Sequence, residues 1–62
     1  MITLTTDFGL KDPYVAEMKG VILSIDPKAK IIDLTHDVEK FNTRMGAFML
    51  ASAVPYLPKG TI

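Results

Sequence analysis

The residues best suited to chemistry lie in one short stretch, where Asp7 and Asp12 flank Gly9. Asp7 directly follows residues 2–6, whose alternation of apolar and hydroxyl side chains predicts a strand. Ligands of open α/β sheets bind beyond the carboxyl ends of the strands, so Asp7 occupies a candidate binding position. A carboxylate there can accept two hydrogen bonds from a vicinal diol such as that of a ribose. Spacing alone leaves open the alternative that Asp7 only shapes the turn.

Asp12 could contact a ligand, or it could cap the start of a predicted helix. It stands immediately before Pro13, and a capping carboxylate followed by proline in the first helical position is typical of a helix start. The helix dipole favours a negative charge at this end. On spacing alone, a cap is favoured over a ligand contact for Asp12.

Other motifs in the sequence give weaker evidence of function. His36 is followed by Asp37, a pair that could act as a base with an orienting carboxylate. Adjacent residues at a strand end point in different directions, so a structural role is favoured for His36. Residues 7–9 spell the metal-binding triplet of protein kinases, but no catalytic loop precedes them. The single glycine of this loop does not make a phosphate-cradling pattern.

Composition excludes several classes of function. The 62 residues hold seven basic and seven acidic side chains, so we expect no partner among nucleic acids or anionic membranes. With no cysteine and a single histidine, we predict no disulfide and no metal site. The longest uncharged apolar stretch, residues 45–57, is too short to span a membrane. No signal peptide follows Met1, so a cytoplasmic location is the default expectation.

The elements that must position these residues follow a regular order. After the first strand, a helix is predicted from Pro13 to Asp26, before Pro27. Its apolar stripe comprises Tyr14, Val15, Met18, Val21, Ile22 and Ile25. Gly20 within it suggests close packing against a strand. Residues 30–35 predict a second strand buried on both faces. This order predicts a right-handed βαβ unit with a parallel pair.

The rest of the chain extends this unit. A second helix is predicted from the cap Asn42 to about Val54, before Pro55. Residues 61–62 then resemble the first step of a third strand. The expected fold class is therefore α/β, with the βαβ unit opening a mostly parallel sheet. Because a core strand is only beginning there, we interpret residues 1–62 as a fragment of a longer protein.

A run of linked residues carries a family resemblance. Residues 6–15 (TDFGLKDPYV), followed by residues 18–20 (MKG), resemble the opening signature of the adenosine-forming S-adenosylmethionine hydrolases. That family also contains the fluorinating and chlorinating enzymes. Residues 32–36 (IDLTH), residues 46–47 and residues 58–62 continue the pattern. The resemblance covers the whole chain, but only the first part of the family's length. It implies that residues 1–62 are the incomplete amino-terminal part of an α/β S-adenosylmethionine-binding domain in a larger, two-domain protein.

The resemblance implies substrate-binding roles for four residues. Asp7 matches the aspartate that holds the ribose hydroxyls of S-adenosylmethionine, and Asp12 matches a carboxylate near its methionine end. Phe41 stands where halogenating members have a tryptophan beside the substrate, so an aromatic wall is retained. Tyr14 stands where those members carry a small hydroxyl residue, and this departure favours the hydrolase branch.

The resemblance also implies a reaction, in which water displaces methionine from the C5′ carbon of the ribose. A sulfonium is an activated leaving group, so the protein mainly positions and desolvates the nucleophile. The family's Asp, Arg and His catalytic set lies downstream, and no catalytic residue is assigned within this chain. Members are trimers with active sites shared between subunits, which implies a homotrimer. S-adenosylmethionine is the substrate, and no cofactor is expected.

Three interpretations remain in order of preference. The chain is the substrate-binding part of an S-adenosylmethionine hydrolase, inactive by itself. The alternative is a non-catalytic nucleoside-binding α/β module. The third is a structural βαβ unit that oligomerises through its exposed sheet. Sequence beyond Ile62 separates the first two, because a downstream Asp, Arg and His set supports the enzyme.

Overall fold

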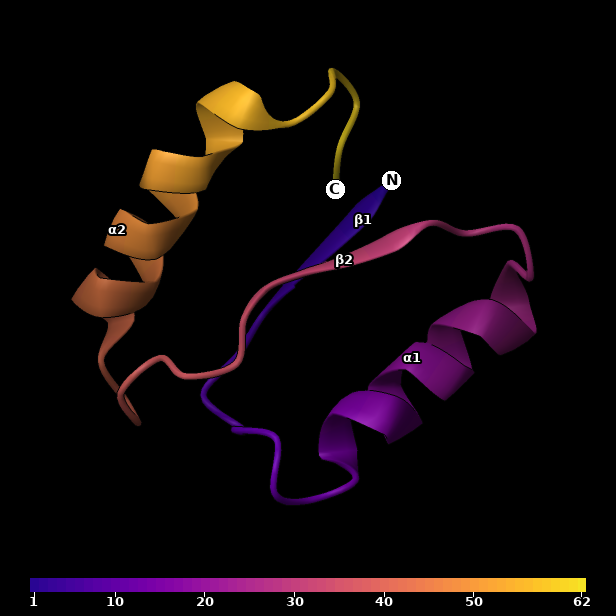
Figure 1. The fold of residues 1–62 in the computed structure, drawn as a ribbon, viewed down its shortest axis with the longest axis horizontal. Helices are drawn as coiled ribbons and strands as arrows, with labels where there is room; N and C mark the ends of the chain where they lie inside the picture. Colours follow the sequence, from indigo (N-terminus) through magenta and orange to yellow (C-terminus); the bar gives the residue numbers. More distant parts are fainter.

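The computed structural model describes residues 1–62. Its elements are β1 (Ile2–Thr5), α1 (Tyr14–Ile25), β2 (Ile31–Thr35), α2 (Thr43–Ala53) and the short 3-10 helix η1 (Val54–Tyr56). Figure 1 shows α1 and α2 on opposite sides of the strands. β1 and β2 pair in parallel, with Ile2 beside Ile31 and Leu4 beside Asp33. The predicted α/β class and the β-α-β order are confirmed.

The sheet has two strands, and β1 also makes hydrogen bonds along its other side. β2 lies on one side of it, and the last residue of the chain lies on the other. The Thr3 N–H donates to the Ile62 carbonyl at 2.6 Å, and the Ile62 N–H donates to the Met1 carbonyl at 3.0 Å. These two bonds follow the slanted pattern of a parallel pair, as predicted for the first step of a third strand. Both termini therefore lie side by side (Figure 1).

α1 begins one residue later than the sequence predicted. Pro13 occupies the cap position and no side chain caps the helix. The prediction that Asp12 caps α1 is therefore wrong. Capping requires the side chain of the cap residue itself to reach the amides two or three residues on, and Asp12 is one residue too early. The other end of α1 agrees with expectation, because Asp26 is extended (φ −134°) before Pro27.

Only part of the apolar stripe of α1 is covered. Val15 is buried and Ile22 is half-buried, whereas the side chains of Val21 and Ile25 are 61% and 81% exposed. Gly20 is also exposed, and a Cβ added there would meet no atom within 4 Å. The close packing predicted for Gly20 is therefore absent among these residues.

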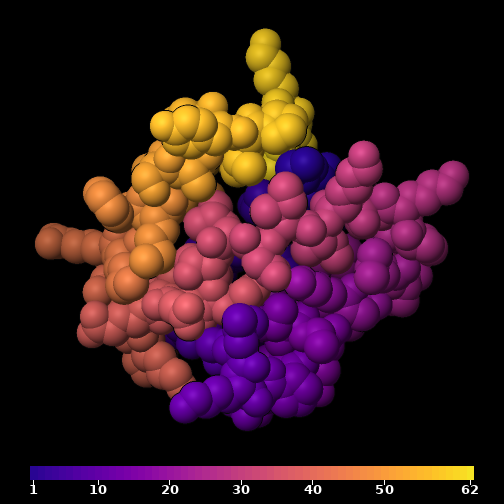
Figure 2. Space-filling view, viewed as in Figure 1, coloured from indigo at the N-terminus to yellow at the C-terminus, as the bar shows by residue number.

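The core is thin. Only Leu4, Val15 and His36 are buried, and the molecule measures 32 × 30 × 13 Å. Ile32 in β2 is exposed, so the prediction that this strand is buried on both faces is wrong for the chain as it stands. Figure 2 shows the broad face, where α2 in orange lies beside the pink segment of β2 and its following loop. Neither α1 nor α2 combines the length and the apolar character needed to cross a bilayer.

α2 is capped as predicted. The Asn42 Oδ1 accepts a hydrogen bond from the Met45 N–H at 3.0 Å. α2 ends at Ala53, and the chain tightens into η1 around Pro55. Gly60 then adopts a φ of 82°, which glycine tolerates without strain, and the chain turns back toward β1.

Candidate functional site

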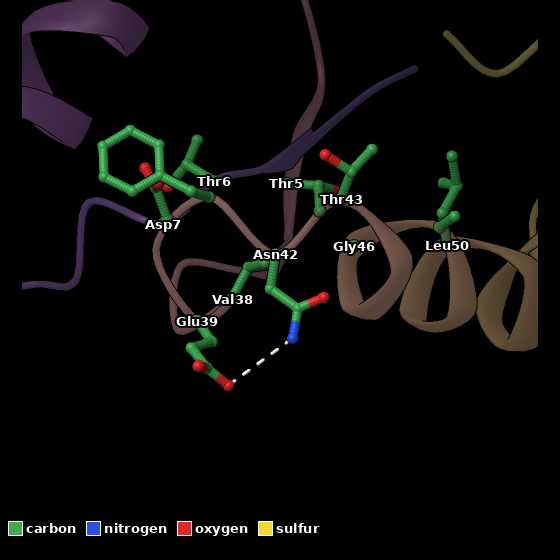
Figure 3. Close-up of a pocket in the computed structure, with 11 residues that line it drawn as sticks. Thr5, Thr6, Asp7, Val38, Glu39, Asn42, Thr43, Gly46 and Leu50 are labelled. Carbon is green, nitrogen blue, oxygen red and sulfur yellow. Dashed lines mark hydrogen bonds between the residues drawn. The ribbon is translucent and has the colours of Figure 1, made fainter.

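An open pocket of about 510 Å³ lies beyond the carboxyl end of β1 (Figure 3). It is lined by the end of β1 and its following loop, the loop into α2 and the first turns of α2, that is by Thr5, Thr6, Asp7, Val38, Glu39, Phe41, Asn42, Thr43, Gly46, Ala47 and Leu50. Its size is typical of sites for small molecules. β2 and the carboxyl-terminal segment flank β1 on opposite sides, and such a switch in strand order is where open α/β sheets bind ligands.

Asp7 is half-buried in the wall of this pocket. None of the side-chain hydrogen bonds or ion pairs of the chain uses its carboxylate. The backbone on either side of it is held, because the Thr6 N–H donates to Thr35 at 3.0 Å and the Gly9 N–H donates to His36 at 2.6 Å, in both cases to the backbone carbonyl. The chain therefore holds the loop while leaving the Asp7 carboxylate available.

Phe41 lines the same pocket from the loop before α2. Its side chain is 96% exposed, and its φ of 62° lies in the left-handed region that non-glycine residues rarely adopt. Backbone strain of this kind concentrates at functional sites. Exposure of a large apolar ring and a strained backbone both cost free energy here, which makes Phe41 a candidate contact residue rather than a core residue.

Asp12 and Tyr14 do not join Asp7 and Phe41 in the pocket. Both are exposed and lie at the start of α1, where the Tyr14 ring is 5.9 Å from that of Phe8. The structure therefore brings together two of the four residues that the resemblance singled out. The substrate-binding roles of all four stay predictions.

Several lining residues were missed by sequence reasoning. Glu39, Asn42 and Thr43 add polar atoms to the pocket, and the Asn42 Nδ2 donates to Glu39 Oε2 at 3.5 Å (Figure 3). These three residues follow the carboxyl end of β2, just as Asp7 follows the carboxyl end of β1. Because parallel strands end at the same edge of a sheet, this position could have identified them as candidate binding residues. No group of three acidic or histidine side chains is placed to hold a metal ion.

A chain of hydrogen bonds runs beneath the loop that carries Asp7. The His36 Nε2 lies 2.9 Å from Asp33 Oδ1, and its Nδ1 lies 2.7 Å from Thr6 Oγ1. Asp33 Oδ2 also accepts from the Lys19 ammonium at 2.8 Å. The hydrogen bond from Lys19, followed by that from His36, holds the pKa of Asp33 below its ordinary value of 3.8. The carboxylate partner of His36 is thus Asp33 and not the adjacent Asp37.

Comparison with known proteins identifies the family. Residues 2–62 match the family described as the SAM hydroxide adenosyltransferase N-terminal domain, where SAM is S-adenosylmethionine. The chain belongs to this family. The resemblance found in the sequence is thereby confirmed.

Within the hydroxide adenosyltransferase family, the chain is similar to (R)-S-adenosyl-L-methionine hydrolase of Methanocaldococcus jannaschii, with 52% identity over 62 residues, 94% of this chain and 24% of the relative. Fluorinase of Nocardia brasiliensis is 31% identical over 62 residues, 100% of this chain and 21% of the relative. An uncharacterized conserved protein of Thermotoga maritima has the same fold in its crystal structure, with a TM-score of 0.96 and 48% identity over 98% of this chain and 24% of that one. This chain therefore spans about a quarter of the length of these relatives.

Proposed function

We propose that the protein containing this segment hydrolyses S-adenosylmethionine to adenosine and methionine, and that the segment is part of its substrate-binding domain. The observation that carries the proposal is that a carboxylate without partners, Asp7, shares a pocket with an exposed aromatic ring, Phe41. A carboxylate can accept both hydrogen bonds of a ribose diol, and an aromatic ring offers an apolar wall to the nucleoside. Identity of 52% to a hydrolase against 31% to a fluorinase favours water over halide as the nucleophile.

In the proposed reaction, the oxygen of water forms a bond to C5′ while the bond between C5′ and sulfur breaks. The electron pair of that bond goes to sulfur, methionine leaves as a neutral thioether, and the proton lost by water passes to solvent or to a base. Because the sulfonium is already activated, catalysis consists mainly of holding C5′ and the water in line and desolvating the water. Asp7 contributes by holding the ribose. S-adenosylmethionine enters as the substrate, and the proposed displacement balances without a cofactor.

The remaining binding roles belong to the same proposal. Asp12, at the start of α1, is proposed to face the methionine end of the substrate, and Tyr14 is proposed to line the hydrolase form of the site. Replacing Asp12 with asparagine should weaken binding of S-adenosylmethionine by about tenfold, the worth of one hydrogen bond to a charged group. Binding of adenosine should not change, because adenosine lacks the methionine. Calorimetric titration of both ligands checks this, and an equal loss for both would place Asp12 elsewhere.

The assembly is proposed to be a homotrimer in the cytoplasm, without nucleic acid or membrane as a partner. The resemblance to trimeric enzymes and the formal net charge of zero support this. Sedimentation equilibrium of the whole protein should give three times the mass of one chain. A monomer at all concentrations would contradict the trimer.

The activity is tested with the whole protein and S-adenosylmethionine in water labelled with heavy oxygen. The expected products are methionine and adenosine that carries the label on its 5′ oxygen. A 5′-halogenated nucleoside formed in the presence of chloride or fluoride would assign halide transfer instead. Tight adenosine binding without any turnover would favour the alternative, a non-catalytic nucleoside-binding module.

A further inference from the structure

We propose that His36 is a positioning residue for Asp7, acting through Thr6 at the end of a relay of hydrogen bonds that begins at Lys19 and Asp33. The inference rests on the proposed function, because it takes Asp7 as the group that holds the ribose diol. His36 itself does not line the pocket, whereas Thr6 does. Any effect of His36 on the ligand must therefore pass through its neighbours.

The relay has a direction that follows from hydrogen-bonding chemistry. An ionised carboxylate can only accept, so Asp33 Oδ1 requires a donor, and a neutral imidazole at His36 must then carry its proton on Nε2. His36 Nδ1 is then an acceptor, and the Thr6 hydroxyl donates to it at 2.7 Å. The Thr6 Oγ1 keeps its lone pairs for the Phe8 N–H, which donates to it at 3.2 Å. The hydrogen bond between the Phe8 N–H and the Thr6 hydroxyl thus spans Asp7, which lies between these two residues in the chain.

Backbone hydrogen bonds hold only part of this loop. They fix the Thr6 N–H, the Thr6 carbonyl, which accepts from the Val38 N–H at 3.2 Å, and the Gly9 N–H. None of them uses the N–H or the carbonyl of Asp7 or Phe8. The bond from the Phe8 N–H to Thr6 Oγ1 is the one that fixes the middle. His36 orients that oxygen, so His36 sets the conformation in which the Asp7 carboxylate meets the pocket.

Burial makes the relay a fixed support rather than a mobile surface contact. His36 is 4% exposed, and an unpaired polar atom at such a position carries a large desolvation penalty, which holds both of its hydrogen bonds in place. Lys19 and Asp33 are 34% and 40% exposed, so the outer end of the relay anchors on the surfaces of α1 and β2. The relay thereby joins α1, β2 and the loop after β1.

The test uses two variants of the whole protein that differ in one feature. His36→Asn retains an acceptor near the position of Nδ1 for the Thr6 hydroxyl, and His36→Leu fills similar space without one. Both lose the bond to Asp33, so both should lose thermal stability. The readout is diol selectivity, the dissociation constant for 2′,3′-dideoxyadenosine divided by that for adenosine. We expect His36→Leu to lower this ratio about tenfold, the worth of roughly one hydrogen bond, and His36→Asn to keep it.

A double-mutant cycle then decides whether His36 acts through Asp7. In an Asp7→Asn background, His36→Leu should cost adenosine no further affinity, because the group that it positions has lost its charge. If His36→Leu does not fold, Thr6→Val takes its place with Thr6→Ser as its control, since valine has the shape of threonine without the hydroxyl.

The outcomes separate the two claims. Unchanged diol selectivity in His36→Leu despite lower stability, or an additive loss in the Asp7→Asn background, would overturn the positioning role alone. A wild-type protein with no preference for adenosine over its dideoxy analogue would overturn the proposed role of Asp7, and this inference with it.

Discussion

Two partly exposed carboxylates, Asp7 and Asp33, have opposite surroundings at the residue scale. Asp33 accepts hydrogen bonds from Lys19 and His36, whereas Asp7 takes part in none of the chain's side-chain hydrogen bonds. A carboxylate whose lone pairs are satisfied within the chain stabilises the fold. One without partners can bind a ligand without breaking an existing bond. This contrast supports Asp7 over Asp33 as the binding carboxylate.

Replacing Asp7 with asparagine keeps the shape of the side chain but removes its charge. Charge-assisted hydrogen bonds are worth roughly 1.5–3 kcal/mol each, against about 1 kcal/mol for neutral ones. Loss of the charge from both bonds should therefore weaken adenosine binding to the variant of the whole protein about 10- to 1,000-fold. The dideoxy analogue, which lacks the diol, should bind the wild type poorly and lose little more in the variant. Calorimetric titration measures all four combinations. Equal affinity of both proteins for adenosine would leave Asp7 as a turn residue.

Asp33 predicts a dependence of stability on pH. Its pKa is lowered in the folded state, mainly by the hydrogen bond from Lys19 and then by that from His36. A carboxyl group with a lowered folded pKa stabilises the fold above its unfolded pKa, and this contribution is lost as the pH falls through the folded value. The melting temperature of Asp33→Asn should therefore lie below that of the wild type at neutral pH, and the difference should shrink as the pH falls below 3.8. A difference that stays constant down to the lowest pH would contradict the ionic role.

Element boundaries show how sensitive capping is to a shift of one residue. Asn42 and Asp12 both precede a helix, and both have side chains that favour the cap position. Asn42 occupies that position and bonds to Met45, whereas Pro13 takes the position that Asp12 would need. Asp12 is therefore left without a structural hydrogen bond, which is compatible with the ligand role proposed for it.

The Asn42 cap can be tested against a matched control. Asn42→Ala removes the acceptor for the Met45 N–H and should lower the unfolding free energy of the whole protein by about 1 kcal/mol. Asn42→Asp retains an oxygen at the same place and should lose only a fraction of that. Denaturant titration with equal slopes for the three proteins gives the comparison. An alanine variant as stable as the wild type would show that α2 is held by packing alone.

At the scale of the whole molecule, the segment buries little. Three residues are buried, while fourteen large hydrophobic side chains are exposed, among them Phe48, Val54 and Ile62. Chains of this length are only marginally stable even with a full core, and this one has no disulfide. Much of the apolar surface of α1 and α2 is therefore exposed to water.

The isolated 62-residue segment should therefore be unfolded, molten or self-associated in dilute solution. Circular dichroism during heating should show a broad change rather than a cooperative transition, and sedimentation velocity establishes whether the sample is monomeric. The whole protein, heated under the same conditions, provides the control. A sharp transition from a verified monomer of the segment would contradict the prediction.

The sequence by itself determined the order of the elements, the cap of α2 and the family. These depend on interactions between near neighbours, such as alternation along a strand, the bond from Met45 to Asn42 and the stop before Pro27, and on a run of residues long enough to be specific. It also placed Asp7 at the end of a strand, since that follows from the strand alone.

Only the tertiary structure decided which side chains meet. His36 finds Thr6 thirty residues away, and Phe41 reaches the pocket of Asp7 because the loops after β1 and β2 meet at one edge. The tertiary structure also decided that Gly20 and Ile32 are exposed, because no other segment packs over them. An apolar pattern in the sequence predicts a buried face but does not identify the segment that covers it. Contacts between distant segments depend on strand order and register, which local spacing does not encode.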